Sequence, residues 1–205
     1  MVWRPDYATT AQVKAFLGID PSDTSEDAEI ATAITAASSA INRATSRQFG
    51  KSDTATLRSY NAVWDRHRPT PAWVVVIDDL YDATGLVVTI GGVTVTAANY
   101  TLEQVNALAD GKVYTSLVLG TSAEAKPSVS APRVDMTTDK WGWPAVPVTI
   151  LNASKLQTGR FHKRKDALFG VAGSPQDGSE VRLLARVDPD VAVMVTDYVR
   201  RWGAV

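Results

Sequence analysis

The feature that most limits how this chain can fold is a change in the spacing of its apolar residues. Between positions 30 and 44 they recur every three or four residues, which places them on one stripe of an α-helix. The stripe consists of Ile30, Ile34, Ala37, Ile41 and Ala44. Most other residues there are Ala, Ser or Thr, so a second helix can approach closely. Beyond Gly50 this period is lost and short β-rich runs follow.

Further helix signals lie at both ends of the chain. Thr9 with Gln12 three residues later has the form of a capping box, and Gly18 is the expected end of that first helix. The striped helix is expected to begin near Ser25, where acidic residues complement the helix dipole, and to end near Gly50.

Two more helices are expected in the C-terminal third. One follows Trp141–Pro144 and should run to about Asp166. The last begins with Asp188 as N-cap and Pro189 at the first helical position.

The central region has the sequence pattern of antiparallel β-structure, with short β-rich runs separated by turn residues. Gly91-Gly92 predicts a two-residue hairpin turn, because glycines readily adopt positive φ. Asp78-Asp79 and Asp110-Gly111 also have the composition of turns. The expected strands are Thr56–Trp64, Trp73–Ile77, Leu86–Ile90, Val93–Thr96, Lys112–Leu119 and Arg133–Met136.

These patterns predict an α+β fold. Helices from the N- and C-terminal regions are expected to form a bundle-like domain, interrupted by a β-rich, antiparallel insertion. The expected boundaries place residues 1–54 and 139–205 in the helical domain and residues 55–138 in the insertion.

Composition narrows the class of protein. Hydrophobic residues make up 45% of the 205 residues and charged residues 21%, which suffices for a globular core. The absence of cysteine excludes disulfides, thiolate metal sites and cysteine nucleophiles, and suits a reducing cytoplasm. The N-terminal stretch lacks a signal-peptide pattern, and no apolar run approaches the roughly 20 residues of a membrane helix. We therefore expect a soluble, intracellular protein without a membrane partner.

The sequence contains no recognisable catalytic motif. His67 lies in a polar turn and His162 near a helix end, and neither has a second ligand at the spacing of a helical zinc site. The serine-hydrolase elbow, the phosphate-binding loop and the dinucleotide fingerprint are absent. We therefore expect no enzyme activity, no metal and no cofactor, although folding can bring together carboxylates that are distant in sequence.

The densest positive charge is RFHKRK at positions 160–165, in a chain whose formal net charge is −1. Cations in the last turn of a helix complement its dipole, so a solvated helix end is one explanation. Contact with a partner protein or with DNA phosphates is the other. Sequence-specific DNA recognition is not expected, because neither a base-reading motif nor a generally basic domain is present.

The stretch Tyr198–Trp202 combines two aromatic residues with two arginines, and these residue types dominate binding hot spots. Packing of this stretch on the chain's own core and docking on a partner are both open interpretations.

Several motifs follow one another in a distinctive order. Tyr7–Ile19 (YATTAQVKAFLGI) precedes an acidic spacer and an Ala/Ile helix that ends in Thr45–Phe49 (TSRQF). The later motifs are Trp141–Pro147 (WGWPAVP), Arg160–Asp166 (RFHKRKD), Phe169–Gly173 (FGVAG), Val181–Leu184 (VRLL) and Asp188–Val191 (DPDV). In this order they resemble the head-to-tail adaptor, or connector, family of tailed double-stranded DNA phages, particularly adaptors from phages of actinobacteria.

The resemblance implies a structural protein of the virion neck, assembled in the host cytoplasm. Such adaptors form a ring, usually dodecameric, that docks beneath the portal, extends the DNA channel and provides a platform for stopper or tail-completion proteins. The implied partners are further copies of the chain, the portal, those neck proteins and non-specifically passing DNA. The large β-rich insertion departs from the simplest members of the family.

Three groups of residues acquire expected roles from this resemblance. Contact with the channel or a partner is expected of Arg160, Lys163, Arg164 and Lys165. Portal docking is expected of Tyr198, Arg200, Arg201 and Trp202. Packing between subunits is expected of Ile30, Ile34, Ala37 and Ile41. The alternatives are a stopper or tail-completion protein of the same neck, and a monomeric β-rich ligand-binding module with a concave apolar pocket and helical flanks.

Overall fold

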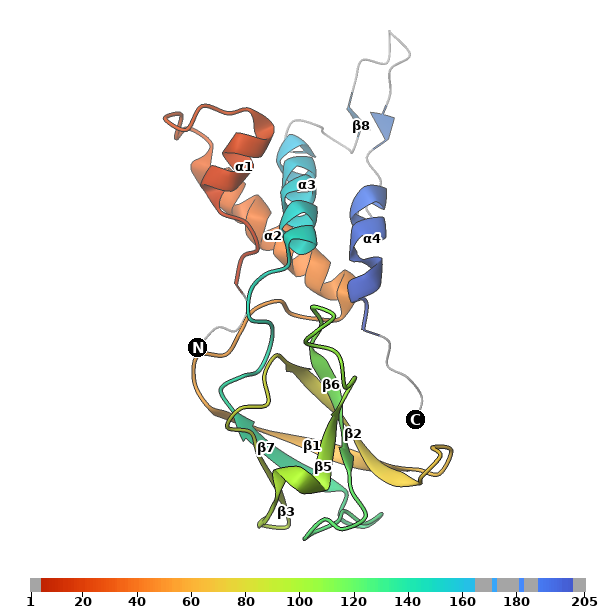
Figure 1. The fold of residues 1–205 in the computed structure, drawn as a ribbon. Helices are drawn as coiled ribbons and strands as arrows, with labels where there is room; N and C mark the ends of the chain where they lie inside the picture. Colours follow the sequence, from red (N-terminus) through yellow and green to blue (C-terminus); the bar gives the residue numbers. More distant parts are fainter. Residues whose placement is uncertain (1–4, 165–170, 173–180, 183–187, 201–205) are drawn as a thin grey trace. The chain divides into compact units, whose positions relative to one another are not determined.

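The computed structural model describes residues 5–164, 171–172, 181–182 and 188–200 (Figure 1). They fall into two compact units. The helical unit contains the described residues up to Phe49 and from Val146 onward, and the β unit spans Gly50–Ala145. The helical unit is thus assembled from two segments that the β unit separates in sequence. Domain boundaries after residues 54 and 138 stay a prediction.

Four α-helices form the described part of the helical unit, each where the sequence predicts a helix. They are α1 (Thr10–Leu17), α2 (Asp27–Thr45), α3 (Val148–Arg164) and α4 (Pro189–Val195). A 3-10 helix, η3 (Thr196–Tyr198), follows α4, and the short strands β8 (Val171–Ala172) and β9 (Val181–Arg182) pair with each other. Within the described residues, no helix has both the length and the apolar character needed to cross a membrane.

The predicted helix caps are confirmed. Gln12 N donates to the Thr9 hydroxyl at 3.2 Å, and Thr9 N donates to Gln12 Oε1 at 2.9 Å, which completes the capping box. Gly18 ends α1 with a left-handed φ of 72°. Asp188 caps α4 by accepting a hydrogen bond from Asp190 N at 2.9 Å.

The core of the helical unit lies where α1 and α3 pack against α2. The buried stripe of α2 contains Ile30, Ile34, Ala37 and Ile41. Ile150 and Ala153 of α3 are also fully buried. Gly159 allows α1 to approach α3, because a Cβ there would lie 3.1 Å from Leu17 Cδ2.

Seven antiparallel strands form the sheet of the β unit. In chain order they are β1 (Thr56–Asp65), β2 (Ala72–Leu80), β3 (Val87–Ile90), β4 (Val93–Val95), β5 (Tyr100–Glu103), β6 (Tyr114–Leu119) and β7 (Arg133–Thr138). Their spatial order is β4-β3-β7-β1-β2-β6-β5. A buried row that crosses four of these strands in register consists of Ala62, Val75, Leu117 and Leu102.

The sheet curls into a half-barrel because its two edge strands are consecutive in the sequence. Only Thr96–Asn99, which includes the 3-10 helix η1 (Ala97–Asn99), separates β4 from β5. This connection spans at most about 18 Å, whereas the edges of a flat seven-stranded sheet lie about 29 Å apart. The two edges must therefore approach each other.

The loop after β6 holds this connection in place. Gly120 N donates to Asn99 O at 2.7 Å, and the Ser122 hydroxyl donates to Asn99 Oδ1 at 3.0 Å. The Glu124 carboxylate accepts from Thr96 N at 3.2 Å and from Asn99 Nδ2 at 3.1 Å. Hydrogen bonding from Thr96, the largest contribution, lowers the pKa of Glu124 to about 2.

The first and last segments of the β unit pair with each other in an arrangement that we call the clasp (residues 50–52 and 140–143). Ser52 N donates to Trp141 O at 2.9 Å, and Trp143 N donates to Gly50 O at 3.0 Å. Gly142 N donates to the Asp79 carbonyl of β2 at 2.6 Å. Gly142 has a φ of 101°, and a Cβ there would lie 1.9 Å from Gly50 O. Only glycine allows this approach.

The tryptophans of the WGWP motif complete the clasp. Trp141 is fully buried, its indole N–H donates to Thr56 O at 3.1 Å, and the Arg58 guanidinium lies 4.7 Å from its ring centroid. The Trp143 indole N–H donates to the Asp79 carboxylate at 2.8 Å. Both indoles thus bury apolar area and satisfy their donors.

The predicted fold class is wrong. Instead of a helical bundle carrying a β-rich insertion, the chain is dominated by a curled seven-stranded antiparallel half-barrel, with four α-helices in the described residues. Local strand signals did not show that all seven strands join one sheet. They also did not show that Lys140–Trp143 pair with the first residues of the β unit and with β2. With 8 and 7 residues, α1 and α4 are also too short to match the longer helices in a regular bundle.

The predictions of individual strands were more accurate than the prediction of the fold class. Six strands lie where expected, and the Gly91-Gly92 turn is confirmed, with φ values of 57° and 83°. Asp78 and Asp79, predicted as a turn, lie inside β2. β5 was missed because it is short and Leu102 is its only buried residue.

We expect Gly142→Ala to destabilise the β unit far more than Gly92→Ala. Both substitutions place a Cβ on a left-handed backbone, which costs about 1–2 kcal/mol. Only at position 142 does that Cβ also collide with a carbonyl, so we expect a loss at least twice as large. Urea unfolding followed by tryptophan fluorescence measures both. Equal losses would show that the clasp does not require the close approach.

We expect Glu124→Gln to reduce the acid sensitivity of the β4–β5 connection. The pKa of Glu124 is depressed in the folded protein, so its stabilising effect is complete above its unfolded pKa and disappears as the pH falls toward about 2. Hydrogen exchange of the Thr96 amide between pH 5 and 2 measures this effect. If Thr96 protection changes equally with pH in both proteins, the carboxylate is not responsible.

Candidate interaction surfaces

The basic run at positions 160–165 is tied into the helical unit. Arg160 Nη1 lies 2.9 Å from Asp188 Oδ2, and the arginine side chain is only 14% exposed. Because Asp188 is the N-cap of α4, the pair joins the last turns of α3 to the first turn of α4. Cation and carboxylate each lie at the helix end that their charge favours.

A second contact from this run reaches α2. His162 Nε2 lies 3.0 Å from Oε2 of Glu26, the N-cap of α2. Lys163 is exposed and Arg164 is half-buried, while Lys165 lies outside the described residues. The run therefore fastens α3 to the starts of two other helices. Its role in contacting a channel or a partner stays a prediction.

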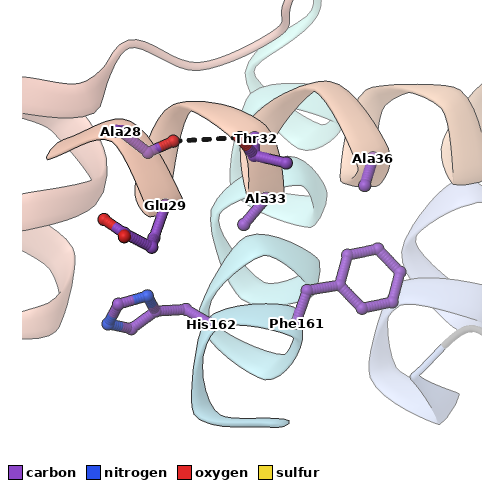
Figure 2. Close-up of a pocket in the computed structure, with 7 residues that line it drawn as sticks. All are labelled: Ala28, Glu29, Thr32, Ala33, Ala36, Phe161 and His162. Atoms are coloured by element: carbon purple, nitrogen blue, oxygen red, sulfur yellow. Dashed lines mark hydrogen bonds between the residues drawn. The ribbon is translucent and has the colours of Figure 1, made fainter. Parts of the chain in front are cut away.

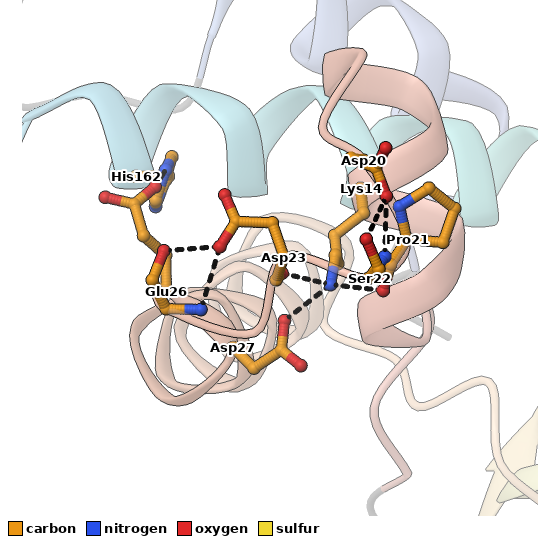
Figure 3. A network of polar contacts seen from close by, with 9 residues as sticks. Lys14, Asp20, Pro21, Ser22, Asp23, Glu26, Asp27 and His162 are labelled. Atoms are coloured by element: carbon orange, nitrogen blue, oxygen red, sulfur yellow. Dashed lines mark hydrogen bonds and ion pairs between the residues drawn. The ribbon is translucent and has the colours of Figure 1, made fainter.

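One buried lysine holds the connector between α1 and α2 (Figure 3). Lys14 Nζ donates to Pro21 O at 3.0 Å, to Asp23 O at 2.5 Å and to Asp27 Oδ1 at 3.0 Å. The lysine side chain is 5% exposed. A buried ammonium group is costly unless protein oxygens replace its water. Here three oxygens do so and fix the path of the connector.

The same connector presents negative charge to solvent. The Asp20 carboxylate accepts hydrogen bonds from the hydroxyl and N–H of Ser22, and Asp23 does the same with Ser25. These hydrogen bonds lower the pKa of both aspartates. The connector is therefore an acidic edge beside the start of α2.

A groove of about 400 Å³ lies between α2 and α3 (Figure 2). Glu29 and His162 lie at one end of the groove, and Ala36 and Phe161 lie at the other. The lining residues are Ala28, Glu29, Thr32, Ala33, Ala36, Phe161 and His162. Most of the lining is uncharged and small.

The residues predicted to pack between subunits point into the chain's own core. Ile30, Ile34, Ala37 and Ile41 are at most 2% exposed. The exposed residues of α2 between positions 30 and 42 are all small and uncharged: Ala31, Thr32, Thr35, Ala36 and Ser39. A neighbouring subunit that packs on α2 must therefore contact these exposed residues, which lie on the side of the helix opposite to the buried stripe. The role assigned to the four buried residues stays a prediction.

The residues predicted to dock on the portal are only partly described. Tyr198 packs edge-on against Phe49, with ring centroids 5.6 Å apart. Arg200 is 9% exposed, and its backbone N–H donates to the last residue of α2 at 2.8 Å. Arg201 and Trp202 lie outside the described residues. Up to residue 200 the segment packs on the helical unit, and portal docking stays a prediction.

One exposed surface was missed in the sequence, the end of the β1–β2 hairpin, which we call the tip (Val63–Trp73). Trp64 and Trp73 are cross-strand partners whose rings lie 5.5 Å apart. Val63 is 48% and Trp64 45% exposed. Arg66 is also exposed, whereas Arg68 pairs with a glutamate of β5. Two tryptophans on either side of a basic turn were the available signal.

The carboxylates of β2 are engaged in structural contacts. Asp78 accepts hydrogen bonds from Arg58 Nη1 at 2.7 Å and from the Tyr60 hydroxyl at 3.0 Å. Burial raises the pKa of Tyr60, which keeps its hydroxyl a donor. In the part of the chain that the structure describes, no group of three His, Asp or Glu side chains is arranged to hold a metal. The absence of enzyme activity stays a prediction.

Comparison with known proteins finds few relatives. No protein-family model matches the sequence, and no curated protein does. A solved structure described as "Neck of empty GTA particle computed with C6 symmetry" contains a chain with a TM-score of 0.46 and 18% identity. The match covers 87% of this chain and 92% of that chain. A likeness of this size supports no statement about function.

We expect Lys14→Met to destabilise the helical unit by about 2–3 kcal/mol, because it leaves two carbonyls and a carboxylate without their donor. Lys163→Met is the matched control, since that lysine is exposed, and should change stability by less than about 0.5 kcal/mol. Urea unfolding followed by circular dichroism at 222 nm measures both. Similar stabilities for the two variants would show that Lys14 does not hold the connector.

Proposed function

We propose that this protein is a structural component of a tailed-phage neck, a ring-forming head-to-tail adaptor. In this role it docks beneath the portal, extends the DNA channel and provides a platform for the stopper or tail proteins. Its work is assembly through complementary surfaces, and no catalysis is involved. The order of the motifs from Tyr7 to Val191 favours this family over other classes.

The observation that carries the proposal is that the two units expose uncharged or apolar surface in different places. The helical unit exposes the uncharged face of α2 with its groove, and the β unit exposes Val63 and Trp64 at the tip. A closed ring of identical subunits requires two different patches on each subunit, one for each neighbour. A ligand-binding module instead buries most of the surface of its ligand in a concave pocket, whereas this groove is open to solvent.

The charge distribution favours passage of DNA over its capture. Arg160 and His162 are engaged by carboxylates of the chain itself, and the formal net charge is −1. Each phosphate that a protein neutralises adds to a strong, salt-dependent affinity. A channel wall with few available cations lets the duplex slide.

Co-expression of the full chain with the portal protein encoded in the same genome tests this proposal. We expect the two proteins to copurify as one closed ring per portal, seen by electron cryo-microscopy and native mass spectrometry. The portal of an unrelated phage is the control and should not retain the ring.

Two results would change the assignment. Binding only to a portal that already carries another ring would identify a stopper or tail-completion protein. A chain that stays monomeric and binds no neck component would overturn the proposed function.

A further inference from the structure

The groove between α2 and α3 contains a polar atom without a partner. The His162 side chain is only 10% exposed, and its Nδ1 forms no hydrogen bond within the described structure. The Glu26 carboxylate can only accept, so the Nε2 that faces it carries the hydrogen. In the tautomer with this one hydrogen, Nδ1 is the acceptor. A buried acceptor without a donor costs free energy that a bound N–H group recovers.

The other properties of the groove define what can occupy it. Its alanine and phenylalanine surface favours an apolar group, and the exposed face of α2 that continues from it has no charge between positions 30 and 42. Glu29 lies beside His162 at one end (Figure 2). The matching occupant therefore has an apolar body, an N–H donor and a positive charge nearby.

The tip of the β unit offers all three. Trp64 is 45% exposed, and its indole N–H forms no hydrogen bond in the described part of the chain. Arg66 follows two residues later, is exposed, and forms no ion pair with any described residue. Trp64 packs edge-on against Trp73, so the Trp64 side chain is already ordered before it contacts a second copy.

We propose that the tip of one copy docks into the groove of a second copy, head to tail. The Trp64 indole lies on the alanine surface and donates its N–H to His162 Nδ1, while Arg66 pairs with Glu29. This inference rests on the proposed ring function and assigns the contact that joins neighbouring subunits. Because tip and groove are different surfaces, each copy uses both, as closure of a ring requires.

Charge favours a second copy over DNA as the occupant. Glu29 lines the groove, and Glu26 contacts His162 in its lining; these carboxylates repel phosphates but attract the Arg66 guanidinium. At the tip, Asp65 and the pairing of Arg68 with Glu103 leave little net positive charge for a polyanion. The complementary partner is therefore present in the same sequence.

Charge reversal on each side tests the contact. Arg66→Glu and Glu29→Arg each place like charges together, so we expect each variant alone to assemble at least 10-fold more weakly than the wild type. Both residues are exposed, so the fold is retained, which circular dichroism verifies. Lys126→Glu and Asp53→Arg reverse exposed charges outside both surfaces and should assemble normally.

Mixing the two variants provides the decisive measurement. In an alternating ring, the glutamate that R66E places on the tip meets the arginine that E29R places beside the groove, and the next junction retains the native pair. An equimolar mixture should therefore recover assembly to within about 3-fold of wild type, although neither variant assembles alone. Mass photometry measures the ring fraction for the protein alone and for the protein bound to its portal.

Substitutions at Trp64 distinguish the contribution of its aromatic surface from that of its indole N–H. Trp64→Ala should weaken assembly by about 30-fold, as expected for a central aromatic anchor. Trp64→Phe keeps most of the apolar surface and loses the N–H, so a smaller loss is expected, and it should not add to the loss caused by His162→Phe. Additive losses would show that indole and imidazole do not meet.

The outcomes distinguish this inference from the proposed function. Wild-type rings on the portal with unaffected charge-reversal variants would overturn the tip-to-groove contact and leave the adaptor function intact. Failure of the mixture to recover assembly would also overturn it. A wild-type chain that forms no ring, alone or on the portal, would overturn both.

Discussion

The β unit depends on the close approach of two backbone segments in the clasp. Gly142 carries no side chain, so its backbone reaches Gly50 and β2 together. This approach places Trp141 beneath Arg58 and brings the Trp143 indole to a buried carboxylate of β2. It also sets the first and last segments of the unit side by side. The chain can therefore leave the helical segments and return to them without opening the half-barrel.

The basic side chains of the helical unit serve mainly to hold its helices and their connections together. Lys14 holds the connector through three oxygens, Arg160 holds the start of α4, and His162 holds the start of α2. Breaking the Lys14 or Arg160 contact leaves a charge without compensation, so these two cations are not available to bind a partner as well. Binding specificity on this unit must therefore come from shape and from the few charges at the groove rim, above all Glu29.

Features that depend on neighbours in sequence could be predicted, and features that depend on distant residues could not. The caps at Thr9 and Asp188 and the Gly91-Gly92 turn are each defined within a few residues, and all three are confirmed. The clasp joins residues that lie at opposite ends of the β unit in sequence, and the curl of the sheet follows from the order of all seven strands. The basic run was a local signal whose partners, Glu26 and Asp188, lie far away in sequence.

Small contact patches between subunits are sufficient for stable association if the protein assembles into a closed ring. An isolated pair of proteins needs an interface of about 1,200 Å² or more for stable association. In a closed ring each copy makes two contacts, and the last contact forms between partners that are already held together, at high effective concentration. One tryptophan in a shallow groove and one ion pair can then hold the assembly, although a single junction is weak. Under the proposed adaptor function, weak junctions would keep free subunits apart until a portal gathers them.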